Sequence, residues 1–307
     1  MTLVVGVDLG GTKIQVVAVD GSDVVADAKL PTPSAGGEAV ARAVADAIAA
    51  MGVDGVRAIG IGAPGVIDRA AGTVLRAPNL NISSSVALTT LVGEATGVDT
   101  VLLDNDVNVA TLAEHRSGAA VGARDVLCVF AGTGVGGGLV LDGELRRGPR
   151  GLTGEIGHTI VRADGRRCGC GGLGHLEAYA GRRCLEAEAR RLHEGGRSTA
   201  LVEIAGERQM KSSVFAKAVA AGDEVVRELL DEAIDALAAA FASAVALIDL
   251  ELIVLGGGLA MKLGEPFISA VDDAMQARLF VPSLAVKVVP AALGDLGGAV
   301  GAALLAS

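Results

Sequence analysis

Two stretches of this sequence repeat one arrangement: a short apolar strand, a glycine-rich turn with a threonine, and a second apolar strand. The first stretch covers residues 3–19 and turns at residues 8–13, and the second covers residues 125–141 and turns at residues 131–138. Glycines in such turns leave backbone N–H groups exposed and allow a phosphate group to approach closely. The repeat therefore predicts a duplicated α/β fold whose two turns hold one phosphate chain from two sides.

The second turn also fits, superficially, the glycine spacing of a dinucleotide-binding fingerprint. That fingerprint requires a helix directly after the turn, whereas the apolar residues 139–141 predict a strand. We therefore reject a Rossmann fold. A third glycine turn, at residues 256–258, does open a predicted helix, whose N-terminus could face a nucleotide. Taken alone, the turn at Gly10 and Gly11 is also typical of a plain hairpin.

Polar side chains follow the strand predicted at residues 100–103. Asp104, Asn105 and Asp106 come directly after it, and residues 107–116 predict a helix. Polar groups at the end of a strand in an α/β sheet lie where ligands commonly bind. Asn105 or Asp106 would also be a normal N-cap, and Asp104 could be a structural charge or a turn residue. These residues alone leave capping and catalysis equally open.

The segment from residue 154 to residue 177 gathers carboxylates, imidazoles and thiols. It contains four potential metal ligands: His158, Cys168, Cys170 and His175. Sulfur and imidazole nitrogen at such short spacing suit a tetrahedral zinc ion, and a site filled by four protein ligands would be structural. Glu155 and Glu177 flank the set and are left for another role. The alternative is that the cysteines are ordinary small residues of a glycine-rich loop, since a Cys-x-Cys pair makes a strained disulfide.

The rest of the chain predicts mainly helices. They are expected at residues 37–51, 176–193, 213–221, 224–248 and 294–305, with a further strand at residues 284–289. The helix at 176–193 carries many arginine and glutamate side chains, which we interpret as a solvated face. The polar turn at residues 78–81 contains Asn79, whose side chain could cap the backbone or bind a hydroxyl group.

Composition limits the classes of function. Hydrophobic residues make up 51% of the 307 residues, which is enough for two modest domains with their own cores. Aromatic residues are only 2%, so the stacking surfaces of a single-strand nucleic-acid binder are missing. The net charge of −10 opposes general affinity for DNA and for anionic membranes.

The sequence also predicts a cytoplasmic location. The apolar run at residues 236–248 is too short to span a bilayer, and we interpret it as a buried helix. The start of the chain, residues 1–11, lacks the basic region of a signal peptide. Four cysteines in a chain without an export signal are typical of a reducing compartment.

These parts, in this order, resemble the ROK family of sugar kinases in the actin-like ATPase superfamily. The resemblance covers essentially the whole chain. Its most specific segments are residues 8–13, Asn105 with Asp106, residues 132–136, residues 154–158 and residues 168–177. It implies two ribonuclease-H-like α/β lobes with a cleft between them. The small lobe would take residues 1–115 plus 291–307, and the large lobe residues 116–290.

The resemblance implies an ATP-dependent hexose kinase that phosphorylates the 6-hydroxyl of a hexose, with glucose as the expected substrate. Asp106 would be the catalytic base. The sugar would contact Gly65, Asn79, Asn105, Asp106, Glu155, His158 and Glu177. The cofactors ATP and Mg²⁺ would contact Asp8, Gly10, Gly11, Thr12, Lys13, Thr133, Gly134 and Gly257, with Asp8 holding Mg²⁺ through water. A structural Zn²⁺ would fix the loop that bears His158 and Glu177.

One position departs from the family pattern. The family usually has three cysteines and one histidine, and His175 stands where the third cysteine would be. Imidazole is still a competent zinc ligand, but the site loses one thiolate charge.

Several alternatives stay open from the sequence. Kinases for N-acetylmannosamine, N-acetylglucosamine, mannose or fructose share the same hydroxyl-binding core, and polyphosphate is a less favoured donor. Sugar-sensing repressors of the family carry a helix-turn-helix, for which the turn at Asp8 leaves no room. An ATPase without a sugar site is opposed by the cluster of Glu155, His158 and Glu177. Family resemblance suggests a homodimer, whereas composition and net charge predict that there are no nucleic-acid or membrane partners.

Overall fold

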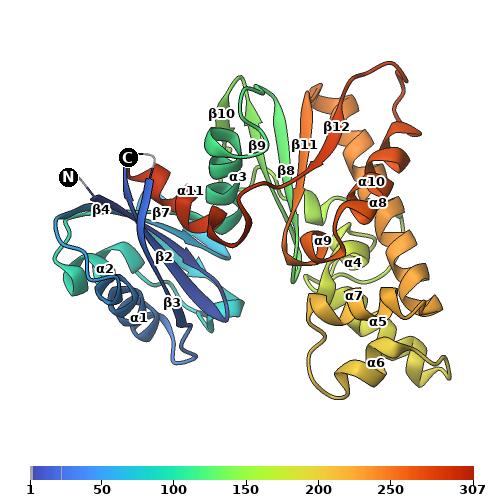
Figure 1. Cartoon of the computed structure of the whole chain (residues 1–307), viewed down its shortest axis with the longest axis horizontal. Helices are drawn as coiled ribbons and strands as arrows, with labels where there is room; N and C mark the ends of the chain where they lie inside the picture. The colour runs from blue at the N-terminus through green and yellow to red at the C-terminus, as the bar shows by residue number, and fades with distance from the viewer. Residues whose placement is uncertain (1–2, 22) are drawn as a thin grey trace. The chain divides into compact units, whose positions relative to one another are not determined.

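The computed structural model describes residues 3–21 and 23–307 and divides into two compact units (Figure 1). Unit 1 comprises Met1–Val121, Arg147–Thr153 and Ala292–Ser307, and unit 2 comprises Gly122–Arg146 and Gly154–Ala291. Met1 and Thr2 lie outside the described residues. They belong to residues 1–11, for which the sequence predicts that there is no signal peptide. The lobe boundaries expected at residues 115 and 290 stay a prediction.

Unit 1 is built on a five-stranded mixed sheet in the order β3–β2–β1–β4–β7. The first three strands pair antiparallel, and β4 and β7 continue the sheet parallel to β1. The strands are β1 (Leu3–Leu9), β2 (Lys13–Asp20), β3 (Asp23–Pro31), β4 (Val56–Ala63) and β7 (Thr100–Asn105). A separate two-stranded hairpin joins β5 (Val66–Asp68) to β6 (Thr73–Arg76).

Unit 2 repeats this sheet with the order β10–β9–β8–β11–β12. Again three strands pair antiparallel and two continue parallel to the first strand of the unit. The strands are β8 (Val126–Ala131), β9 (Val135–Leu141), β10 (Glu144–Arg146), β11 (Leu252–Gly256) and β12 (Lys287–Pro290). The repeated topology confirms the duplicated α/β fold that the two strand–turn–strand stretches predict.

Helices cover both faces of the unit 1 sheet. The helices of this unit are α1 (Gly37–Ala50), α2 (Leu88–Thr96), α3 (Asp106–Ser117) and α11 (Gly297–Leu305), with short 3₁₀ turns at η1 (Pro78–Leu80) and η3 (Gly294–Leu296). Val5 and Val7 of β1 share a core with Val40 of α1, whereas Val4 packs with Ala299 of α11. Because successive side chains of a strand point to opposite faces, α1 and α11 lie on opposite sides of the sheet.

Unit 2 is larger and more helical. Its helices are α4 (Glu177–Ala180), α5 (Arg182–Glu194), α6 (Ala200–Ala205), α7 (Ser212–Ala220), α8 (Glu224–Ile248), α9 (Gly258–Leu263) and α10 (Glu265–Gln276), with a 3₁₀ turn at η2 (Ile156–His158). The apolar run at residues 236–248 forms the second half of α8 and contributes Leu237 and Phe241 to the core, as predicted. Within the described ranges, no helix is long and apolar enough to cross a membrane.

One predicted helix is wrong in its continuity. Residues 176–193 form two helices, because Gly181 adopts an extended backbone between α4 and α5. A Cβ atom at Gly181 would lie 2.8 Å from the Glu177 carbonyl oxygen, so a larger residue would not fit there. The last predicted helix begins with the 3₁₀ turn η3, and the strand predicted from residue 284 begins only at Lys287.

Helix α11 lies unusually close to the backbone of its neighbours. A Cβ atom at Gly60 of β4 would lie 1.8 Å from the carbonyl oxygen of Ala302, and one at Gly301 would lie 1.8 Å from that of Val109. These separations are far below van der Waals contact. Glycine is therefore required on both sides of α11, which packs backbone to backbone between the sheet and α3.

The buried carboxylate of Glu114 in α3 accepts hydrogen bonds from two separate backbone segments of unit 1. Glu114 is 3% exposed, and its oxygens accept hydrogen bonds from Ala119 N at 2.8 Å and from Ala292 N and Leu293 N at 3.0 Å. The chain first leaves unit 1 after Val121 and enters it for the last time at Ala292. One side chain thus holds the backbone close to both of these crossings.

We expect Glu114→Gln to destabilise the protein by about 2–4 kcal/mol, because an amide cannot accept from three N–H groups with both of its atoms. Urea denaturation measures the change. Glu94→Gln on the exposed side of α2 is the matched control and should stay within about 0.5 kcal/mol of wild type. A Glu114→Gln protein that unfolds at the wild-type midpoint would contradict this role.

Candidate active site

The turn between β1 and β2 carries the first group of predicted nucleotide residues. Gly10 N donates to Lys13 O at 2.9 Å, which closes the turn, and Gly11 and Thr12 are exposed. A Cβ atom at Gly11 would lie 2.8 Å from the Asn79 carbonyl oxygen, so Asn79 of η1 lies against this turn. Unit 1 therefore brings one predicted sugar residue beside the predicted phosphate turn.

Asp8 stands at the end of β1, next to the same turn. Burial raises the pKa of its carboxyl group, while nearby Lys13 lowers it and Asp295 raises it. A Cβ atom at Gly298 would lie 2.8 Å from Asp8 Cγ, so α11 closes one side of the carboxylate. A partly desolvated carboxylate beside an exposed turn is a suitable place for a hydrated cation.

Asn105 is the N-cap of α3. Its Oδ1 accepts from Val107 N at 2.9 Å, and its Nδ2 donates to Gly65 O at 3.4 Å. The capping alternative is thus confirmed for Asn105, and the same side chain contacts the predicted sugar residue Gly65. Asp106 is the first residue of α3 and half-buried, and its Oδ1 accepts from Val107 N at 3.0 Å.

Asp104 is a structural charge. It is 3% exposed, and its Oδ2 accepts from Arg147 Nε at 2.6 Å. Its Oδ1 accepts from Asn105 N at 2.8 Å and from Asn108 Nδ2 at 3.0 Å. Three donors therefore hold the backbone directly before Asp106, and one of them comes from the segment of unit 1 that starts at Arg147.

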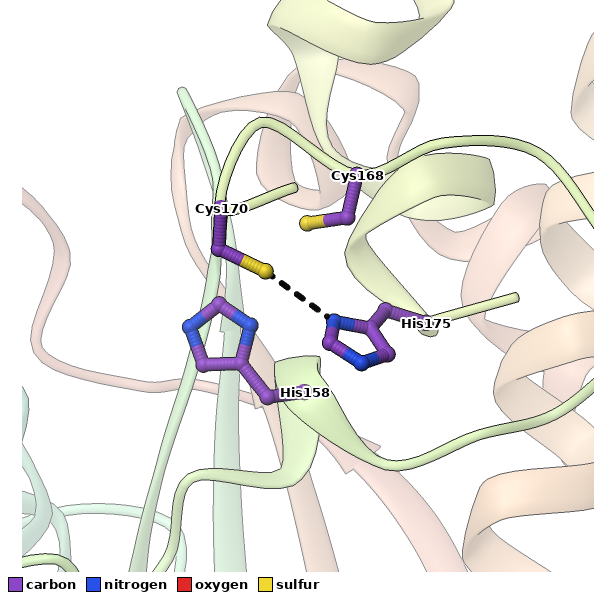
Figure 2. A group of neighbouring side chains, drawn as sticks. All are labelled: His158, Cys168, Cys170 and His175. Carbon is purple, nitrogen blue, oxygen red and sulfur yellow. Dashed lines mark hydrogen bonds between the residues drawn. The ribbon is translucent and has the colours of Figure 1, made fainter. Parts of the chain in front are cut away.

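Unit 2 gathers the four predicted metal ligands (Figure 2). The ligand atoms of His158, Cys168, Cys170 and His175 all lie within 4.8 Å of one another. Cys170 Sγ lies 3.2 Å from His175 Nδ1, and the two imidazole rings meet edge-on with centroids 5.5 Å apart. Tetrahedral zinc bonds imply ligand–ligand separations of about 3.3–3.8 Å. The donor set therefore suits a zinc ion, and the ligand atoms, which lie within 4.8 Å of one another, would have to approach by up to about 1 Å to share one ion.

The four side chains differ in exposure. Cys168 is buried, whereas His158 and Cys170 are exposed at the surface of the loop. Burial raises the pKa of the Cys168 thiol to about 12. A metal ion at this position would displace the thiol proton, since the thiolate is the form that binds.

Glu155 and Glu177 extend this cluster in two directions. Glu155 Oε2 lies 3.8 Å from His158 Nε2. Glu177 Oε1 accepts from Cys168 Sγ at 3.4 Å, and its Oε2 accepts from Val135 N at 2.9 Å. Glu177, which the sequence left free for another role, thus already connects the metal-ligand cluster to the start of β9.

The glycine turn between β8 and β9 adjoins the turn between β11 and α9. Gly132 N donates to Gly134 O at 2.9 Å, and Thr133 is exposed at the tip. A Cβ atom at Gly132 would lie 3.9 Å from Gly258 N, and one at Gly257 would lie 2.5 Å from Ala131 O. The predicted nucleotide residues of unit 2 are therefore neighbours, and Glu177 joins them to the predicted sugar residues.

The sequence missed two residues at this turn. Arg182 is buried, and its Nη2 donates to Thr133 Oγ1 at 3.1 Å. Ser212 Oγ lies 3.7 Å from the Cβ position of Gly258. We interpreted the arginines of α5 as a solvated face, and nothing local distinguishes Arg182 from the others. Arg182 differs from them in its partner Thr133, which lies 49 positions earlier in the chain.

Comparison with known protein families matches residues 4–307 to the ROK family. The chain belongs to the ROK family. A glucokinase of Streptomyces coelicolor is 34% identical over 100% of this chain and 98% of its own length. Among solved structures, a ROK hexokinase from Thermus thermophilus is 36% identical with a TM-score of 0.84, covering 99% of this chain and 98% of that one.

A second solved ROK structure holds ligands. It is a glucokinase from Streptomyces griseus in complex with glucose and AMPPNP, 33% identical over 99% of both chains, with a TM-score of 0.84. These matches confirm the resemblance to the ROK family. They also confirm the expected fold class, two α/β lobes of the actin-like ATPase type, of which the two repeated sheets are the cores.

Two neighbouring arginines test the role of Asp104. Arg147→Met should destabilise the protein by about 2–4 kcal/mol, because it leaves a buried carboxylate with only the more distant Arg69, at 3.6 Å, as a cationic partner. Thermal and urea denaturation measure the effect. Arg146→Met is the control, since Arg146 pairs with the exposed Asp142 and Glu144 and should change stability by less than about 1 kcal/mol. Equal effects of the two substitutions would show that the Asp104 pair is not structural.

Proposed function

We propose that the protein is an ATP-dependent glucokinase that transfers the γ-phosphoryl group of MgATP to the 6-hydroxyl of glucose. The observation that carries this proposal is the likeness, over 99% of both chains, to a glucokinase solved with glucose and AMPPNP. Supporting it, this chain presents carboxylate, amide and imidazole side chains beside glycine turns in each unit. A sugar needs paired hydrogen-bond donors and acceptors, and these groups supply both.

Asp106 is the proposed catalytic base. Its place at the first position of α3 fixes the carboxylate at a helix N-terminus, where negative charge is favoured. The side chain accepts the proton of the attacking hydroxyl while the phosphoryl group moves to the sugar oxygen. Asp104 and the Asn105 cap hold this position through the bonds described above.

The remaining sugar contacts are proposed from both units. Unit 1 contributes Gly65, Asn79 and Asn105, and unit 2 contributes Glu155, His158 and Glu177. The carboxylates accept from sugar hydroxyls, and the amide and imidazole can donate or accept. Because Glu177 also binds Val135 N, it would hold the sugar in a fixed relation to the glycine turn at Gly134.

The nucleotide contacts are proposed at the three glycine turns. They comprise Gly10, Gly11, Thr12 and Lys13 in unit 1 and Thr133, Gly134 and Gly257 in unit 2. Exposed N–H groups of these turns would donate to phosphate oxygens. Asp8 would hold Mg²⁺ through water, and the ion would supply positive charge against the phosphates.

We propose a structural zinc ion on His158, Cys168, Cys170 and His175. With all four positions filled by protein, the ion would order the loop and leave no open site for chemistry. It would thereby orient His158 and Glu177 toward the sugar. A homodimer, which the family resemblance suggests, completes the proposal. We also propose a cytoplasmic location without nucleic-acid or membrane partners, in keeping with the composition and net charge.

Coupled ADP release with MgATP, measured against a panel of hexoses and N-acetylhexosamines, tests the function. We expect turnover with glucose, and a loss of about 10²–10⁴-fold in kcat for Asp106→Ala because the base is removed. Asp99→Asn, an exposed aspartate of the same unit, should retain full activity. Turnover independent of every sugar, or an unimpaired Asp106→Ala enzyme, would reject the assignment. Preference for another sugar would change only the substrate.

Metal analysis of protein purified without chelators tests the zinc site. We expect about one zinc per chain in wild type and a clear loss in Cys170→Ser, which removes one thiolate ligand. Cys128→Ala is the control, because Cys128 is buried in β8 outside the cluster and its removal should leave the zinc content unchanged. Wild-type protein free of zinc would contradict the proposal.

A further inference from the structure

Arg182 is a buried cation at the predicted nucleotide turn. It is the first residue of α5 and 9% exposed. Its Nη2 donates to Thr133 Oγ1 at 3.1 Å, and its Nη1 donates to the carbonyl oxygen of Met210. The backbone adds to this contact, since Arg182 N donates to Gly132 O at 3.1 Å. The start of α5 is thus bonded to the turn through main chain and side chain.

The charge of Arg182 has little compensation within the protein. Its two side-chain partners are a hydroxyl and a carbonyl, and no carboxylate of the described chain forms an ion pair with it. Glu186, one turn further along α5, bonds instead to Arg190 at 3.0 Å. Burial lowers the pKa of the Arg182 guanidinium, offset in part by Glu186. A buried cation with neutral partners favours an anion nearby.

The contact with Thr133 fixes the direction of a hydroxyl group. A guanidinium has only donors, so Thr133 Oγ1 must be the acceptor in this hydrogen bond. The hydroxyl proton of Thr133 is then left to be donated elsewhere. Thr133 is exposed at the tip of the turn, and the acceptor that a nucleotide brings to such a turn is a phosphate oxygen.

Arg182 also links the β8–β9 turn to the segment before α7, which adjoins the β11–α9 turn. Its partner Met210 lies shortly before α7, whose first residue Ser212 approaches the Gly258 position to 3.7 Å. The guanidinium therefore holds the β8–β9 turn at a fixed distance from the segment that adjoins the β11–α9 turn. Loss of the side chain would loosen both the hydroxyl and the spacing of the turns.

We propose that Arg182 is a positioning residue for the phosphoryl donor, presenting the Thr133 hydroxyl as a hydrogen-bond donor to a phosphate oxygen of ATP. The inference rests on the proposed function, because it takes the turn at Thr133 as part of the nucleotide site. In this role Arg182 affects the binding of the phosphoryl donor ATP and not the binding of the sugar.

A double-mutant cycle tests the proposal in the full-length enzyme. The variants are Arg182→Met, Thr133→Val and their combination, measured for kcat, for KM of ATP and for KM of glucose. We expect each single variant to raise the KM of ATP about tenfold, with the KM of glucose within about twofold of wild type. The KM of ATP of the combined variant should not exceed that of the single variant with the larger effect, because Arg182 acts through the Thr133 hydroxyl.

Two further variants separate positioning from simple support of the fold. Arg182→Lys keeps one donor for Thr133 and should recover part of the ATP affinity. Arg190→Met is the matched control: it lies on the same helix and bonds to the carbonyls of Gly206 and Arg208, away from the turn. It should lower stability without changing the KM of ATP.

The outcomes distinguish this inference from the proposed function. Additive effects in the cycle, or equal increases in both KM values, would overturn the role of Arg182 while leaving the kinase intact. Absence of sugar-dependent ATP turnover in wild type would reject the function itself. If Arg182→Met does not fold, Arg182→Lys with Thr133→Val forms the same cycle, and additivity there counts equally against the proposal.

Discussion

The carboxylate of Glu177 is the interaction on which the arrangement of unit 2 depends. One oxygen accepts from Val135 N at the glycine turn, and the other lies 3.4 Å from Cys168 Sγ in the metal-ligand cluster, where it accepts a hydrogen bond as long as the thiol keeps its proton. A Cβ atom at Gly134 would lie 2.1 Å from Glu177 Oε2, so the turn must be glycine for this contact to form. Two regions with different chemistry, thiols and imidazoles on one side and an exposed turn on the other, therefore share one side chain.

In unit 1, too, carboxylates that accept several hydrogen bonds hold the backbone in place. Asp104 and Glu114 are buried acids of this unit, and each accepts several hydrogen bonds. Burial of an unpaired charge would be far more costly than any packing gain from these positions. Asp104 fixes the backbone before Asp106, and Glu114 fixes the chain where it leaves and re-enters the unit. The polar interior thus holds the proposed catalytic base in place, while the close packing of α11 supplies the rigid support.

How much the sequence could predict depended on how far apart the interacting residues lie along the chain. The duplicated sheets and the metal-ligand cluster were predictable, because each is written in a short stretch: strand–turn–strand in one case, and four ligands between residues 158 and 175 in the other. Arg182 was missed because its burial depends on Thr133, and Asp104 stayed ambiguous because Arg147 comes from another segment. The helix break at Gly181 was missed for the same reason, since the next two backbone N–H groups, of Arg182 and Arg183, donate to the distant carbonyl oxygens of Gly132 and Thr133. Asn105 needed the structure to show that it caps α3.

The substitution of histidine for the family's third cysteine has an electrostatic consequence for the proposed zinc site. Two thiolates and two neutral imidazoles would balance the charge of a divalent zinc ion, whereas three thiolates would leave the centre with a net negative charge. Glu155 and Glu177 lie directly beside this centre, at His158 and Cys168 respectively. A neutral centre repels these carboxylates less than an anionic one. His175 therefore fits a loop that, in the proposed function, holds two carboxylates toward an uncharged, hydroxyl-rich substrate.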